Sequence, residues 1–153
     1  SGSILFKYEP REGPEGKVTA LAQMCDPKFL EPEGRKDIPY SPLAFALDSK
    51  NRRVYFVPSA RAYAIGSYAE TFGVTLDHHL LMYDLKTGKK TNLGVLRTDD
   101  GRRVFGCEAA AVAPDGTLYI CGEAEVAQGD QATRKRGDKT PTALHLFIYK
   151  PQI

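Results

Sequence analysis

The residues best suited to chemistry gather in and directly after one long polar segment, 59–77. They are Arg61, Tyr63, Tyr68, His78 and His79. The planar guanidinium of arginine can bind a carboxylate with two parallel hydrogen bonds. Tyrosine offers a face on which a sugar can stack and a phenolic proton, and histidine can act as a general base near neutral pH. Together these groups could bind an acidic ligand and move a proton on it.

Glu108 supplies a further carboxylate at the start of a predicted inner strand, where it could bind a cation or a sugar hydroxyl. Structural roles explain the same residues equally simply. The glutamate could cap a backbone group, and the tyrosines could pack between structural units. Adjacent strand residues point to opposite faces, so His78 and His79 cannot easily share one metal ion. They could simply be polar residues at the start of a strand.

Metal and cofactor chemistry find little support in the spacing of the candidate ligands. Cys107, Cys121 and His145 are metal ligands by type, but no CxxC or HxxxH spacing occurs. We therefore predict no metal site, and no cofactor can be assigned. The Ser-His-Asp elbow, the phosphate loop and the dinucleotide fingerprint are also missing from the sequence.

A second long polar segment, 123–142, carries Glu123, Glu125 and the basic tripeptide 134–136. Long loops on a rigid scaffold often carry function. The tripeptide could contact phosphate or an acidic polysaccharide, although such a run is most often solvated. Disorder is an equally simple reading of this Gly- and Gln-containing segment.

Composition excludes several classes of protein. The 153 residues are 42% hydrophobic and 26% charged, which is typical of a folded domain. A formal charge of +2 gives no electrostatic footprint for nucleic acid, and no apolar run is long enough for a membrane span, so we expect neither partner. Cysteine is present as Cys25, Cys107 and Cys121, an odd number that leaves one bridge, between the last two, open.

These side chains must be positioned by β-strands, because the apolar segments are short, rich in Val, Ile, Tyr and Phe, and separated by turn residues. Strong turns occur at 84–90 and 114–117, where a glycine can supply positive φ. No segment shows a long helical period, so we predict almost no helix. The expected strands are 4–9, 17–23, 43–48, 53–58, 78–84, 90–95, 107–113, 117–122 and 143–149.

The strands recur in a repeat of about 66 residues. The segment LLMYDL at 80–85 is echoed by LFIYKP at 146–151, with Tyr83 and Tyr149 separated by 66 positions, and a third echo opens the chain at 5–10. Repeats of this length indicate solenoids, propellers or arrays.

A second element recurs nearly in step with the first. Asp48 and Asp115 each follow an Ala-containing strand, precede a short turn, and lie 67 positions apart. Four antiparallel strands per repeat, with small residues in the first, favour the blade of a β-propeller. An ordinary antiparallel sandwich with accidental internal similarity is the alternative.

The stretches 80–94 and 109–122 resemble the blades of bacterial NHL, Kelch and lactonase-like propellers through their YDL-x-TG-K turn and PDG-x-LY hairpin. Similar long-loop propellers occur among polysaccharide lyases, including ulvan and oligogalacturonate lyases, and among sugar-lactone hydrolases. The resemblance implies a carbohydrate-active protein, lyase-like if it is an enzyme, that acts on an acidic polysaccharide, and it favours a secreted or periplasmic location. The implied residues are catalytic His78, His79 and Tyr68 and substrate-binding Arg61, Tyr63 and Glu108.

The expected strands amount to a little over two blades in one domain, 1–153: a partial blade (4–42), a full blade (43–95) and three strands of a further blade (107–149). Propellers close with about four to eight blades, and an open array exposes sheet edges and apolar faces. We therefore expect the chain to be the C-terminal portion of a larger propeller. Its partners would be further blades of the same protein, copies of itself or a second chain. A non-catalytic interaction module, or a partial propeller that completes its ring by assembly, is the functional alternative.

Overall fold

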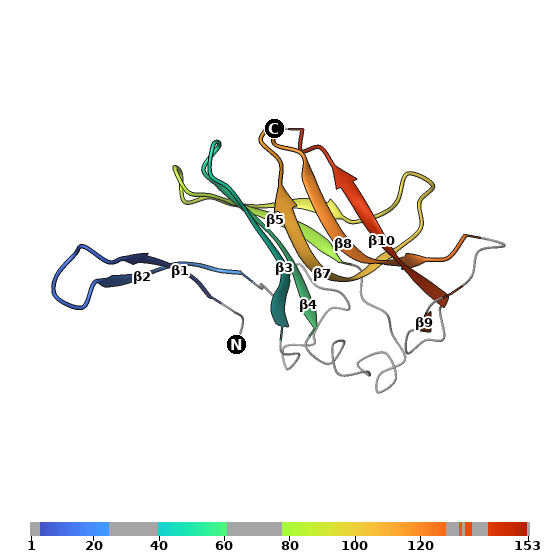
Figure 1. Ribbon diagram of the computed structural model, residues 1–153, viewed down its shortest axis with the longest axis horizontal. Helices are drawn as coiled ribbons and strands as arrows, with labels where there is room; N and C mark the ends of the chain where they lie inside the picture. Colours follow the sequence, from blue (N-terminus) through green and yellow to red (C-terminus); the bar gives the residue numbers. More distant parts are fainter. Residues whose placement is uncertain are drawn as a thin grey trace.

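The computed structural model describes residues 4–24, 40–60, 78–127, 132, 134–135 and 141–152. In these ranges the chain is all-β, with antiparallel pairing throughout, and this part of the sequence-based prediction is confirmed. The strands form one two-stranded and two four-stranded sheets (Figure 1). They are β1 (Ile4–Glu9), β2 (Lys17–Gln23), β3 (Tyr40–Asp48), β4 (Arg53–Ala60), β5 (His79–Asp84), β6 (Lys90–Val95), β7 (Val104–Val112), β8 (Leu118–Glu125), β9 (Arg134–Lys135) and β10 (Pro141–Tyr149).

The first four-stranded sheet is a simple meander in the order β3-β4-β5-β6. Its tight connections follow from local chemistry. In the β5–β6 turn, Asp84 Oδ1 accepts hydrogen bonds from the backbone N–H groups of Lys86 (2.7 Å) and Thr87 (2.9 Å). Gly88 completes this turn at a φ of 71°, a conformation that residues with a side chain rarely adopt.

The second four-stranded sheet has the order β7-β8-β10-β9 and differs from the expected three strands in two respects. Its strands are longer than predicted, since β7 begins at Val104 and β8 continues to Glu125. A fourth strand, β9, is also present, but it is only two residues long and pairs with Pro141 and Thr142 alone.

The β1–β2 hairpin coincides with the predicted strands 4–9 and 17–23. It projects from the body of the molecule at the left of Figure 1. It is joined to the first four-stranded sheet by hydrogen bonds that include those from the Tyr83 hydroxyl to the carbonyl of Leu21 (3.4 Å) and from Lys90 Nζ to the carbonyl of Gln23 (2.8 Å).

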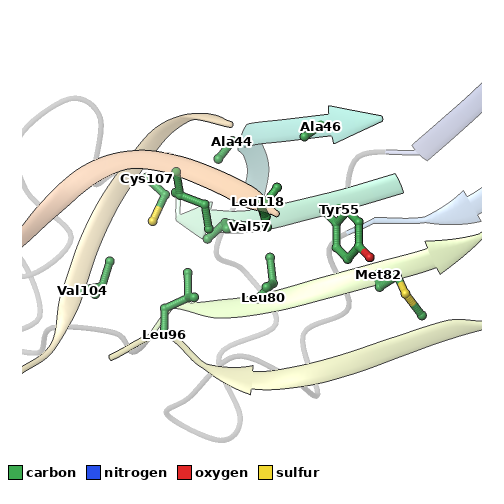
Figure 2. Packing of buried hydrophobic residues seen from close by; sticks show 11 residues of the cluster. Ala44, Ala46, Tyr55, Val57, Leu80, Met82, Leu96, Val104, Cys107 and Leu118 are labelled. Carbon is green, nitrogen blue, oxygen red and sulfur yellow. The ribbon is translucent and has the colours of Figure 1, made fainter. Parts of the chain in front are cut away.

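The hydrophobic core lies between the two four-stranded sheets (Figure 2). The first sheet contributes Ala44, Ala46, Tyr55, Val57, Leu80 and Met82, and the second contributes Val104, Cys107, Leu118 and Ile120. Ala44 and Ala46 lie on β3, which packs beside β7, so their small side chains allow the two inner strands to approach closely. Burying each larger aliphatic side chain here contributes about 1.5–3 kcal/mol.

Within the described ranges, no helix has the length and apolarity required to cross a membrane.

Candidate functional site

The two candidate histidines at the start of β5 have different surroundings. The side chain of His78 is 2% exposed, and its carbonyl accepts a hydrogen bond from the N–H of Leu96 (2.7 Å). His79 is only partly buried, and its Nδ1 lies 3.0 Å from the side-chain amide nitrogen of Asn92. Of the two imidazoles, only that of His79 is open to solvent.

Glu108, the predicted sugar-binding carboxylate, is exposed on β7. It lies where the pairing of β7 with β8 shifts register, between Phe105 and Ala109. The other predicted site residues lie outside the described residues, namely Arg61, Tyr63 and Tyr68.

The acidic residues at the start of the second predicted loop belong to β8 instead and form structural contacts. Glu123 is buried and accepts a hydrogen bond from Thr142 Oγ1 on β10 (2.7 Å). Glu125 Oε1 pairs with Arg103 Nε at 2.6 Å, and Oε2 accepts the backbone N–H of the same arginine at 2.9 Å. Burial opposes ionisation of Glu125, but these interactions outweigh it and lower its pKa. The contacts fix the end of β8 to the start of β7 and to β10.

A polar pocket of about 400 Å³ lies between corresponding turns of the two sheets. It is bounded by the β3–β4 turn, the β7–β8 turn and the residues that follow β10. The β3–β4 and β7–β8 turns lie close together. A Cβ atom added to Gly116 would lie only 3.8 Å from Asn51 Nδ2. The lining residues are Asp48, Asn51, Arg53, Tyr55, Asp115, Gly116, Thr117, Lys150 and Pro151.

Both carboxylates of this pocket are held by their own turns. Asp48 accepts hydrogen bonds from the backbone N–H (3.0 Å) and Nδ2 (2.7 Å) of Asn51. Asp115 accepts the backbone N–H (3.0 Å) and the hydroxyl (2.9 Å) of Thr117. These donors stabilise the ionised forms, so both aspartates carry fixed negative charge at neutral pH.

The pKa values follow from these contacts. Burial opposes ionisation of Asp48, but the hydrogen bonds from Asn51 and the nearby charge of Arg53 lower its pKa below the ordinary value. The pKa of Asp115 is lowered by the hydrogen bonds from Thr117. Burial raises the pKa of Tyr55 although Arg53 hydrogen-bonds to its hydroxyl, so that hydroxyl remains protonated.

Sequence reasoning used Asp48 and Asp115 only as markers of the repeat and assigned no role to Arg53 or Lys150. A signal was available. Two acidic residues at corresponding turns of adjacent repeats are expected at the same end of stacked sheets. Arg53, at the start of β4, and Lys150, directly after β10, then lie at that end as well.

Cys107 and Cys121 are both free thiols in the structure, so the bridge left open by the sequence does not form. Cys121 pairs across the sheet with Ala109 instead, beyond the register shift in β7. Burial raises the pKa of Cys107 to about 12. In the described part of the chain, no three His, Cys, Asp or Glu residues are grouped as they would be around a metal ion.

The outer face of the second four-stranded sheet is apolar, and we call it the open face. It comprises Ala109, Ala111, Tyr119, Cys121, Leu144, Leu146 and Ile148. Its β10 side chains are among the most exposed apolar groups described, at 62%, 66% and 64% for Leu144, Leu146 and Ile148. Such a continuous apolar surface is a feature of interaction sites.

Comparison with known proteins gives no relative: no family model, no curated protein and no solved structure matches this chain.

Proposed function

We propose that this chain is a segment of a β-propeller and that its function is assembly, in which the open face receives a further blade. The first four-stranded sheet supports this proposal as a complete up-and-down blade. The second sheet supports it as a following blade whose fourth strand is represented only by β9.

The observation that carries the proposal is that equivalent residues are buried in one sheet and exposed in the next. Val54 pairs with Tyr83 and Leu118 pairs with Tyr149, so β5 and β10 occupy the same place in their sheets. Leu80 then corresponds to Leu146, Met82 to Ile148, Tyr55 to Tyr119 and Ala46 to Ala111. In the first sheet these residues are the core, covered by the second sheet. In the second sheet they form the open face.

The opposite end of the molecule presents the complementary surface. On the β1–β2 hairpin, Phe6 and Tyr8 are 56% and 59% exposed, and Val18, paired with Tyr8, is 64% exposed. By the LFxY echo, Phe6 and Tyr8 correspond to Phe147 and Tyr149, which pack against the core between the two four-stranded sheets. The β1–β2 hairpin thus carries the residues with which one sheet covers the sheet before it. The open face carries the residues that such a sheet would cover. Contacts of this head-to-tail kind close into rings when the rotation permits.

The outer edge of β10 supports the same conclusion. β6 lies along β5 from His79 to Tyr83, whereas in the described part of the second sheet β9 reaches only Pro141 and Thr142. The segment 143–149 carries no Asp, Glu, Lys or Arg, the residues that usually protect free edges from pairing. A pocket of about 300 Å³ adjoins 146–149, between them and the connection 96–99. An added strand in the position of β6 would lie along this edge.

The solution mass as a function of concentration tests the proposal. We expect the chain to associate through the open face with a second copy when no other blade is present. Leu146→Glu should shift the mass to that of the monomer, because it places a charge in the interface. Val95→Glu is the matched control: Val95 is also an exposed apolar strand residue, 36% exposed, but lies outside the open face. A wild-type protein that stays monomeric at every concentration would overturn the proposal.

An enzyme acting on an acidic polysaccharide is the second candidate. Its predicted residues Arg61, Tyr63 and Tyr68 lie outside the described residues. Among the described residues, His79 is the accessible candidate base. One described feature favours an acidic carbohydrate as a ligand, the polar pocket between the turns.

A further inference from the structure

The polar pocket between the β3–β4 and β7–β8 turns contains cationic groups that the protein leaves without a carboxylate partner. Among the described residues, neither Arg53 nor Lys150 forms an ion pair. Arg53 Nε is buried and has no hydrogen-bond partner in this part of the structure. The Arg53 guanidinium lines the pocket and hydrogen-bonds the neutral hydroxyl of Tyr55, which leaves its positive charge without a carboxylate partner in the described residues.

The negative charges of the pocket do not neutralise these cations by direct contact. Every carboxylate oxygen of Asp48 and Asp115 already accepts a hydrogen bond from its own turn. Each oxygen keeps a second lone pair that can accept a hydroxyl proton. The pocket therefore presents fixed acceptors beside two cationic groups that have no carboxylate partner among the described residues.

We propose that this pocket binds a small carboxylate ligand that also carries hydroxyl groups, of which a uronic acid is the representative. The ligand carboxylate accepts hydrogen bonds from Arg53, and Lys150 adds a second positive charge at the mouth. The ligand hydroxyls donate to Asp48 and Asp115. The volume of about 400 Å³ is in the range of small-molecule sites and accommodates a single sugar ring.

The geometry explains why both features of the ligand are required. A simple anion meets two carboxylates as well as two cations and gains little net attraction. A neutral sugar satisfies the aspartates but leaves the positive charge of Arg53 without a carboxylate. Only a ligand with both groups matches both sets of partners, so the site discriminates by pairing and not by charge alone.

Calorimetric titration of the full chain with sodium glucuronate, glucose and sodium acetate tests the proposal. Glucuronate should bind, and glucose and acetate should bind at least about tenfold more weakly, since each lacks one set of partners. Failure of glucuronate to bind, or equal binding of acetate, would overturn the proposal. The pocket lies between two sheets of one chain, so this result is independent of the assembly of the open face.

Arg53→Met should weaken glucuronate binding at least about tenfold, because it removes the charged donor and keeps the length of the side chain. Arg11→Met is the matched control, since Arg11 is exposed in the β1–β2 turn, away from the pocket lining. Equal binding by these two variants would contradict the assignment. If Arg53→Met does not fold, Lys150→Met provides the same test at an exposed residue, with a smaller expected loss of affinity.

Discussion

Leu80 and Leu146 occupy the same place in the two four-stranded sheets, but Leu80 is 2% exposed and Leu146 is 66% exposed. Met82 and Ile148 differ in the same direction, at 7% and 64%. The strand pairing around each pair is the same, so neither local sequence nor register accounts for the difference. The difference arises because the first sheet is covered by the second and nothing described covers the second.

The comparison shows that corresponding apolar positions are covered in one sheet and exposed in the next, a difference typical of the interior and end units of a repeat array. The second sheet carries the residue types of an interior strand on a surface. Under the proposed assembly, exposure of Leu, Ile and Tyr on the second sheet marks the place of a partner.

Matched truncations of these two leucines should give the largest effect. Leu80→Ala should lower the free energy of unfolding by about 2–5 kcal/mol, because it leaves a cavity between the sheets. Leu146→Ala should change that free energy by less than about 0.5 kcal/mol in the monomer, because its side chain is mostly in water. Urea denaturation of both variants at low protein concentration measures the difference. Equal losses would show that the two positions are not distinguished by burial.

Much of the fold was predictable, for identifiable reasons. The alternation of apolar residues and the turn sequences placed the hairpins within a few residues, and the 66-residue echo placed β5 and β10 in equivalent positions. β9 was not predictable, because Arg134 and Lys135 carry no strand signal and pair only where Pro141 and Thr142 bring β10 alongside. The continuation of β8 to Glu125 was missed because a glutamate at a strand end resembles a loop residue until its partner Arg103 is known.

The candidate site was less predictable than the fold. His78 and His79 were chosen by residue type, and type does not reveal that one imidazole is buried and the other adjoins Asn92. The pocket between the turns was missed because Arg53 and Asp115 come together only when two sheets stack. A site composed from separate repeats has no local sequence signature, and the signal in this chain is the repeat spacing of Asp48 and Asp115.

Two turns join the first two strands of the two four-stranded sheets. Replacing the glycine in one turn and introducing a glycine in the other should change the free energy of unfolding in opposite directions. Arg52 has a φ of 57°, and Gly116 has a φ of 88°. Gly116→Ala should lower the free energy of unfolding by about 1–2 kcal/mol, because a side chain is strained there. Arg52→Gly should raise it by about 0.5 kcal/mol, since relief of the same strain exceeds the entropic cost of glycine. Thermal unfolding of the two variants measures these effects. Changes in Tm of the same sign would contradict the assignment of strain to both positions.

Acid should distinguish the two aspartates of the pocket by a smaller margin. Both have pKa values below the ordinary 3.8, so each stabilises the fold fully above that pH, and the contribution is lost as the pH falls through the lowered value. Asp48 is buried and Asp115 is exposed, so solvent screens the contribution of Asp115 more strongly. Asp48→Asn should therefore flatten the dependence of unfolding free energy on pH below about 4 more than Asp115→Asn does. Urea unfolding of the wild type and both variants between neutral and acidic pH measures these slopes. A larger flattening for Asp115→Asn would mean that the exposed carboxylate, and not the buried one, carries the acid sensitivity.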